Sequence, residues 1–275
     1  MAKGIQYVAP PLPLPGRAGS LLAAAHTPTE PITRNFVPLG YRAAGGAWWA
    51  LLDPCGPGRA DHAGDDLDDV VQAWPFTIDV EETCSTFGLD DLQARAEARM
   101  AAVESAAIGR ELWTGELATE ADHDINPRLA AGAAVRDLAP GGAVKGKTAI
   151  GLLEQALAGA FGGELGAIHV TPSAFAFLPA PTASGDLLLT QRGTRVVADA
   201  GYPGTGPDGA DPAAGESWVY ATARPSVRRG PIVTDGPPAD AIASVNELTY
   251  TAQRDAWVAF PGSVFAVRLI ITEGD

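Results

Sequence analysis

The 275-residue chain has few cysteines, few lysines and no long apolar run, and each shortage excludes a class of protein. Cys55 and Cys84 are its two cysteines and form no Cys-x-x-Cys pair, so we expect neither zinc nor redox chemistry from them. No run of about 18 apolar residues is present, and we expect neither a membrane span nor a signal peptide. The net charge is −14 and the longest basic cluster is Arg228-Arg229. This excludes a protein that binds nucleic acid or anionic lipid through positive charge.

Glycine and proline are abundant instead, with 32 and 23 residues, and they predict many turns and long excursions. Residues 1–34 are punctuated by prolines and predict an extended arm that is ordered only when it lies on something else. Two strand-like runs, 47–52 and 73–80, flank the polar, acidic segment 61–69. This pattern predicts a long hairpin over residues 35–80, which needs a neighbour to pack against.

The longest segment without proline or strand-like alternation is residues 89–115, and it predicts a long helix over about 90–114. Asp90 and Asp91 suit the N-terminal end of a helix, and Gly115 suits its C-terminal end. The predicted apolar stripe is narrow and made mostly of small side chains, as for a helix that lies flat on a sheet. Its members are Leu92, Ala96, Met100, Val103 and Ala107.

The second half of the chain alternates short helical and extended patterns, which predicts an α+β fold. A helix is expected over Ala149–Phe161, with Thr148 as its N-cap and Gly162-Gly163 as its end. A buried strand at 166–170 and a short helix at 172–178 should follow. The remaining predicted strands are 187–190, 194–197, 217–223, 225–233, 248–260 and 263–272.

Residues 141–148, GGAVKGKT, match the phosphate-binding pattern G-x-x-x-x-G-K-[ST]. In such a loop Gly141 and Gly146 let backbone amides wrap phosphates, Lys147 reaches the terminal phosphates and Thr148 holds magnesium. The motif should leave a buried strand, whereas the preceding run is charged and ends at Pro140. We therefore favour a plain loop before a helix, and keep a P-loop nucleotide-binding protein, whose binding Lys147→Ala would abolish, as an alternative.

Other polar residues give weaker patterns. The acidic loop 61–69 lacks the spacing of an EF-hand, so a solvated loop is favoured over a cation site. Asp122, His123 and Asp124 are consecutive and cannot easily face one ligand, and His169 lies in an apolar strand as a satisfied core histidine. Trp48 and Trp49 are interpreted as packing anchors. No catalytic motif of a hydrolase or metalloprotease is present, so we expect no enzyme, no cofactor and no metal.

Three stretches carry a resemblance to a known family. They are AVESAAIGRELWTG at 102–115, ALAGAFGGELGAIHVTPSAFAFL at 156–178 followed by LLLTQRGTRVVADAGYPG at 187–204, and LTYTAQRDAWVAFPGSVFAVRL at 248–269. Together with the order of arm, hairpin and long helix, they resemble the major capsid proteins of tailed bacteriophages. These have the Hong Kong 97-type fold, which encapsulin shells share. The pair Gln253-Arg254 departs from the family, which often has Glu before the arginine.

The resemblance implies an N-terminal arm (1–34), an extended hairpin or E-loop (35–80), a P-domain that includes the spine helix (81–149 and 236–275), and an A-domain (150–235). It implies a major capsid protein that assembles with itself, as pentamers and hexamers, into an icosahedral shell around double-stranded DNA. A scaffolding protein and a portal are implied partners, decoration proteins are optional ones, and the virion is the location after synthesis in the bacterial cytoplasm.

Two features bear on that implication. No lysine lies between Lys3 and Lys145, so a hairpin-lysine crosslink of the kind that some members form is not expected. An encapsulin-like compartment with protein cargo would share the fold and remains an alternative to the phage capsid.

Overall fold

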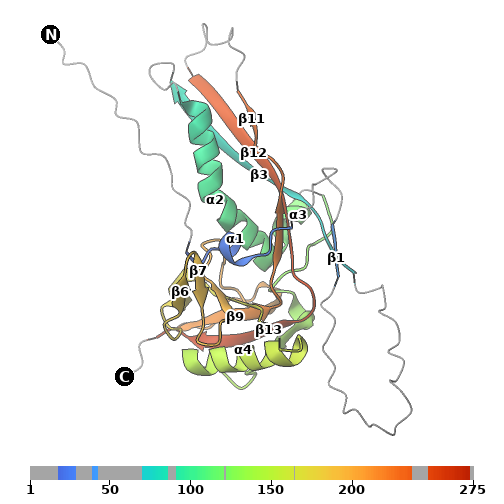
Figure 1. Cartoon of the computed structure of the whole chain (residues 1–275), viewed down its shortest axis with the longest axis vertical. Coiled ribbons are helices and arrows are strands. Elements are labelled where there is room, and N and C mark those ends of the chain that lie inside the picture. The colour runs from blue at the N-terminus through green and yellow to red at the C-terminus, as the bar shows by residue number, and fades with distance from the viewer. Residues whose placement is uncertain are drawn as a thin grey trace, which may run out of the picture.

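The computed structural model describes residues 18–28, 39–42, 70–85, 91–120, 122–163, 165–236 and 247–272, drawn in colour in Figure 1. Most of the predicted arm, the tryptophan-containing run 47–52 and the acidic loop 61–69 lie outside these residues. None of the helices in the described part is long and apolar enough to cross a bilayer.

The elements form a mixed α+β fold, as predicted. The helices are α1 (Leu21–Ala24), α2 (Leu92–Thr114), α3 (Glu116–Glu120), α4 (Gly146–Ala160) and α5 (Pro172–Phe175), with 3₁₀ turns η1 (Gly132–Ala134) and η2 (Pro207–Gly209). The strands are β1 (Leu39–Arg42), β2 (Val70–Ala73), β3 (Phe76–Ser85), β4 (Val135–Asp137), β5 (Ala167–His169), β6 (Thr182–Ser184), β7 (Leu187–Leu189), β8 (Arg195–Val197), β9 (Glu216–Thr222), β10 (Ser226–Arg229), β11 (Val233–Asp235), β12 (Glu247–Ala259) and β13 (Val264–Ile270).

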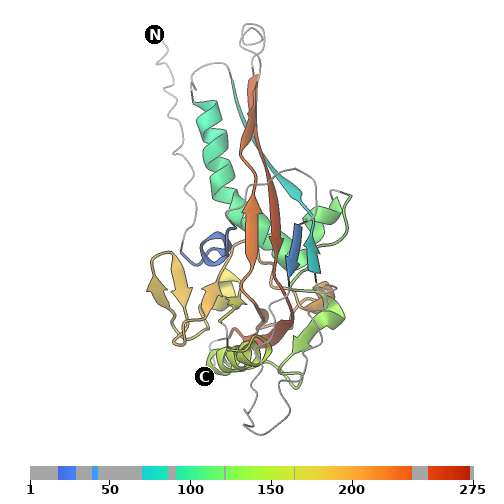
Figure 2. The ribbon, with the colours of Figure 1, turned by 45° about the vertical axis from the view of Figure 1, so that its right-hand side comes forward.

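The upper half is a long, narrow sheet with α2 along one face (Figures 1 and 2). β12 pairs antiparallel with β3 on one side, and with β10 and β11 on the other. Phe76, Ile78 and Val80 of β3 are buried in the same core as the helix, whereas Thr77 and Asp79 between them are exposed. This alternation is what a sheet with one covered face produces.

Helix α2 confirms the predicted long helix and ends at Gly115, whose φ of 68° is left-handed. The predicted stripe is confirmed at Ala96 and Met100, which are fully buried. It is wrong at Val103, which is 37% exposed. The buried row continues from Met100 to the residue four positions later, Glu104. A carboxylate therefore occupies the place where the apolar pattern predicted a hydrocarbon side chain.

The lower half is a seven-stranded sheet in the order β4-β13-β9-β5-β8-β7-β6, with α4 lying across one face (Figure 1). Helix α4 begins at Gly146 with Lys145 as its N-cap, so the prediction of Thr148 as the cap was wrong. A Cβ on Gly146 would lie 2.2 Å from the carbonyl oxygen of Phe177. Glycine thus lets the first turn of α4 approach the segment after α5 closely, and the helix starts earlier than its apolar pattern indicates.

Two smaller regions pack beside these halves. Strands β1 and β2 pair antiparallel, from Leu39 with Ala73 to Arg42 with Val70, at the base of the predicted hairpin. The strand predicted over 73–80 is interrupted at Trp74-Pro75, which separates β2 from β3. In the N-terminal part, residues 18–28 lie on α2 and β8 as an arm should, but they include the short helix α1, which the proline pattern did not predict.

Candidate functional site

The strongest candidate site is a set of buried polar contacts between the long helix α2 and the segments packed around it. At its upper end, Glu104 of α2 is 3% exposed and accepts hydrogen bonds from two arginines. Arg254 Nη1 of β12 lies 2.7 Å from Glu104 Oε1, and Arg229 Nη1 of β10 lies 3.0 Å from Glu104 Oε2. Both arginines are partly covered. This network of two ion pairs therefore fixes the position of helix α2 on the sheet.

About two turns further along α2, Glu111 is fully buried beside the hairpin base. Its Oε1 accepts from Asn126 Nδ2 at 2.7 Å, and its Oε2 accepts from the amide of Leu117 at 2.7 Å. Burial raises the pKa of the Glu111 carboxyl above its ordinary value, and the hydrogen bond from Asn126 opposes that rise in part.

Asn126 also holds the backbone of Trp74, the residue between β2 and β3. Its Oδ1 accepts from the Trp74 amide at 2.6 Å, and its Nδ2 donates to the Trp74 carbonyl at 3.0 Å. The Trp74 ring stacks on His123, with 4.9 Å between centroids. His123 therefore packs as an aromatic surface, while its neighbours Asp122 and Asp124 are exposed. Within the described residues no cluster of metal-ligating side chains is found.

Asp199, two residues after the end of β8, connects the N-terminal segment to helix α2. Its Oδ2 accepts from the amide of Leu21 at 2.9 Å and from Ser105 Oγ at 2.6 Å, and its Oδ1 accepts from the amide of Gly201 at 3.0 Å. Its observed role is to cap α1 and hold α2.

His169 of β5 confirms the prediction of a satisfied core histidine. It is fully buried, with Nδ1 2.8 Å from the hydroxyl of Tyr202 and Nε2 3.0 Å from Thr222 Oγ1. Burial lowers the pKa of His169 to about 3, and burial also raises the pKa of Tyr202, with the charge of Asp199 adding to that rise. A neutral imidazole held by two hydroxyl groups away from solvent suits a structural role rather than proton transfer.

The phosphate-loop match at 141–148 is placed between β4 and α4. The amide of Gly142 donates to the carbonyl of Ala139, and the amide of Val144 donates to the carbonyl of Arg268. These two amides are therefore not free to bind a phosphate. Lys147 and Thr148 are exposed on the first turn of α4. β4 is a short strand at the edge of the sheet, whereas the motif normally leaves a buried one. The geometry therefore disfavours a nucleotide site.

No protein-family model and no curated protein sequence matches the chain. Among solved structures, the holo-SrpI encapsulin complex from Synechococcus elongatus PCC 7942 superposes with a TM-score of 0.59 at 11% identity, covering 99% of this chain and 95% of that one. The capsid of Ralstonia phage GP4 gives 0.55 at 10% identity, with 100% and 97% covered. The capsid of cyanophage Pam1 gives 0.54 at 10% identity, with 99% and 98% covered.

The chain has the Hong Kong 97-type fold. The expectation drawn from the three resembling stretches is thus confirmed at the level of the fold, which capsid and encapsulin shells share. Those stretches supply both sides of two of the buried contacts, Glu104 with Arg254 and Ser105 with Asp199.

Several site residues had no sequence signal. Glu111, Asn126 and Trp74 lie in three separate segments, and their pairing is visible only when the Hong Kong 97-type fold brings those segments together. Asn126 is one of three asparagines in the chain and precedes Pro127. The scarcity of asparagine is the one sequence feature that distinguishes Asn126, and it indicates neither a partner nor a role.

Proposed function

We propose that this protein is the major capsid protein of a tailed bacteriophage, assembling as pentamers and hexamers into an icosahedral shell around double-stranded DNA. The observation that carries the proposal is the near-complete correspondence of the chain with two phage capsid subunits of the same fold. We further propose that its role is structural and requires no catalytic residue.

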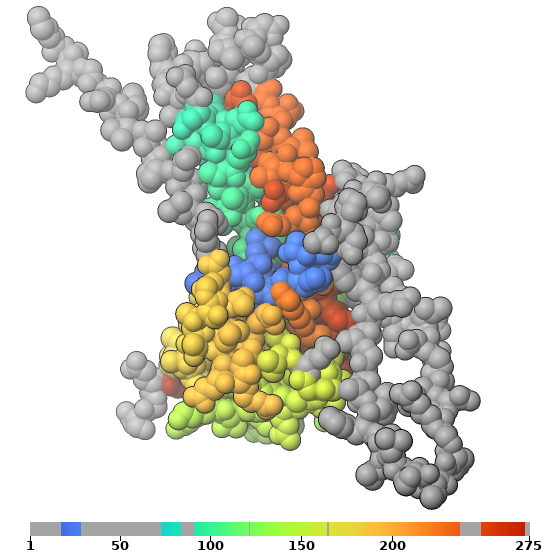
Figure 3. Space-filling view, viewed as in Figure 1, coloured from blue at the N-terminus to red at the C-terminus, as the bar shows by residue number. Residues whose placement is uncertain are grey.

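The shape of the subunit supports assembly. In Figure 3 the α2–β12 half stands as a thin projection above the broader lower half. Among the described residues, one face of this sheet is left uncovered, and exposed Thr83 and Glu81 of β3 continue the polar row on that face. Contacts with neighbouring copies would cover such elements, so that association adds to the stability of the fold.

Charge supports DNA as enclosed cargo rather than as a tightly bound ligand. The net charge of −14 disfavours binding of phosphates, and DNA packed under such a surface stays free to leave. We propose a scaffolding protein and a portal as further partners, with decoration proteins as optional ones. We propose the virion as the location, after synthesis in the bacterial cytoplasm.

The second candidate is the shell of an encapsulin-like compartment. It is favoured by the superposition on the encapsulin subunit, which has a TM-score of 0.59 and covers 99% of this chain. The two candidates predict the same shell and differ in its content.

The test has two steps. The purified protein is first measured by light scattering and negative-stain electron microscopy, where closed shells or a ladder of pentamers and hexamers are expected. A monomer or dimer that persists at high concentration, with and without a co-expressed scaffold, would contradict both candidates. Particles from the native source are then treated with nuclease and opened: protected double-stranded DNA is the result expected for the capsid, and a co-purifying enzyme is the result expected for the compartment.

A further inference from the structure

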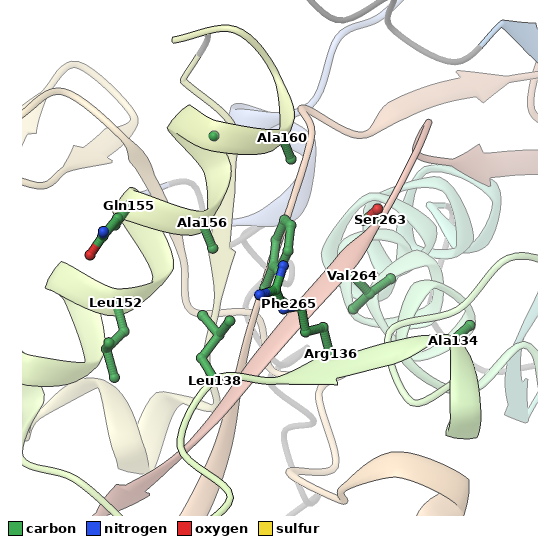
Figure 4. Close-up of a pocket in the computed structure, with 11 residues that line it drawn as sticks. Ala134, Arg136, Leu138, Leu152, Gln155, Ala156, Ala160, Ser263, Val264 and Phe265 are labelled. Atoms are coloured by element: carbon green, nitrogen blue, oxygen red, sulfur yellow. The ribbon is translucent and has the colours of Figure 1, made fainter.

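The lower sheet ends in a hollow of about 570 Å³ beside strand β4 (Figure 4). Helix α4 forms one wall, and β4 with the first residues of β13 forms the other. Most of the lining is apolar. The principal side chains are Leu138, Leu152, Ala156, Val264 and Phe265.

Arg136 is the one charged residue that lines this hollow. It lies on β4 at the position paired with Phe265 of β13, and its side chain is exposed. No ion pair to Arg136 is present within the described part of the chain. A chain with a net charge of −14 thus presents an unpaired cation inside an apolar hollow, which suits an apolar surface that carries one carboxylate.

The opposite edge of the same sheet carries an exposed carboxylate at the tip of a hairpin. One strand of that hairpin is exposed (Thr182–Ser184), and the other carries three half-buried leucines (Leu187–Leu189). Strands β6 and β7 form a hairpin in which Ser184 pairs with Leu187, leaving Gly185 and Asp186 as a two-residue turn. Gly185 has φ of 60°, which such tight turns require. Asp186 is exposed and has no ion pair among the described residues, and its carbonyl accepts from the amide of Gly19 at 3.0 Å, which braces the tip.

Sheet order places these two features at opposite ends of one layer. β4 is the first strand and β6 is the last, and Figure 1 shows the β6–β7 hairpin standing out on one side of the lower half. Two different surfaces on opposite sides of a subunit produce head-to-tail contacts, which close into a ring when the rotation between copies allows it. A two-fold dimer would instead need one self-complementary surface.

We propose that the β6–β7 hairpin of one copy docks in the β4–α4 hollow of the next, with Asp186 paired to Arg136 of the neighbouring copy. This contact rests on the proposed function, since it is a joint between subunits of one pentamer or hexamer. The braced tip enters a mostly apolar hollow, so the pair is partly shielded from solvent and a charge reversal on either side places like charges together.

Charge-swap variants test the joint. Arg136→Asp and Asp186→Arg should each raise the protein concentration needed for ring or shell assembly by at least about tenfold. The double variant Arg136→Asp/Asp186→Arg should restore assembly to near the wild-type level. Asp211→Arg, an exposed charge reversal in the loop before β9, is the matched control and should assemble as the wild type does. Circular dichroism of each variant checks that the subunit is folded.

Mixing the two single variants gives a sharper result. In an equal mixture each joint is matched only when the variants alternate around the ring, and alternation closes only for an even number of copies. The mixture should therefore form hexamers but not pentamers, and without pentamers no closed icosahedral shell. Native mass spectrometry and electron microscopy distinguish these products.

The outcomes separate this joint from the proposed function. If the wild type forms shells but the single reversals assemble normally, or the double variant is not restored, the joint is wrong and the shell proposal stands. If the wild type forms no oligomer under any assembly condition, the proposed function itself fails. Mixed single variants that produce pentamers as readily as hexamers would also overturn the joint.

Discussion

Glu104 Oε1 and Arg254 Nη1 lie 2.7 Å apart, although 150 residues separate them in the chain. The contact joins the middle of α2 to the middle of β12, and Arg229 from β10 completes it on the other carboxylate oxygen. One buried carboxylate thus connects the spine helix to two strands of the sheet beneath it. It replaces apolar packing at this point with a contact that depends on orientation.

Replacing Glu104 with glutamine should destabilise the subunit by about 3 kcal/mol, because two partly buried arginines lose their counter-charge. The free energy of unfolding of dissociated subunits, measured with urea, gives the value. Glu82→Gln breaks the more exposed ion pair with Arg99 and serves as the control, with an expected loss within about 1 kcal/mol. Equal losses for the two variants would show that the buried contact contributes no more to the free energy of unfolding than the exposed one.

Much of the fold could be predicted because its elements have local signals. The long helix, α4, and most strands of the C-terminal half follow from apolar periodicity bounded by glycine and proline, and they appear within a few residues of the expected bounds. The strand expected over 225–233 is wrong, because it is divided into β10 and β11. Short elements such as β4, β6, α1 and α3 were missed, since three to five residues carry too little pattern.

The buried contacts could not be predicted, for a physical reason. The carboxylate at 104 interrupts an apolar stripe, and a local pattern assigns that place to Val103, which the structure leaves exposed. Only the partners Arg229 and Arg254, which are supplied by distant strands, make burial of the charge tolerable. The resemblance placed Glu104 and Arg254 in two separate motifs, and no local rule states that the motifs meet.

Stability should fall with acid through His169. Its pKa is about 3 in the folded chain and about 6.5 in the unfolded chain, so only the unfolded state takes up a proton between these values. The stabilising effect of the neutral imidazole is complete above pH 6.5 and is lost as the pH falls towards 3. From pH 7 to pH 5 this group should remove about 2 kcal/mol of unfolding free energy.

The variant His169→Gln isolates this contribution. It should be less stable than the wild type at pH 7, and its stability should fall less steeply between pH 7 and pH 5. Glu111, whose raised pKa acts in the opposite sense by favouring the folded state as the pH falls, is present in both proteins and cancels in the comparison. His26→Gln, which replaces an exposed histidine, is measured beside it as the matched histidine substitution. An unchanged slope for His169→Gln would contradict the assignment.

The contact between Asn126 and Trp74 should hold the base of the hairpin. Asn126→Ala leaves the Trp74 amide and Glu111 Oε1 without their partner, at an expected cost of about 2 kcal/mol. Hydrogen exchange should accelerate most at the Trp74 amide and along β2. As a control, Thr77→Ala on β3 removes an exposed side-chain hydrogen bond to Asp255. It should change the free energy of unfolding by under about 0.5 kcal/mol. If exchange rises evenly over the whole subunit, Asn126 stabilises the fold without acting on the hairpin.

Two glycines of helix α4 should respond to alanine with opposite signs. At Gly151 the new methyl group meets nothing within 4 Å, so Gly151→Ala should stabilise the helix by about 0.5–1 kcal/mol through lower backbone entropy in the unfolded chain. At Gly146 the same methyl group would lie 2.2 Å from the Phe177 carbonyl oxygen, and relieving that overlap should cost about 1–3 kcal/mol. Urea midpoints of the two variants measure the difference. A stabilised Gly146→Ala variant would mean that the close approach of α4 to Phe177 is not a feature of the folded chain.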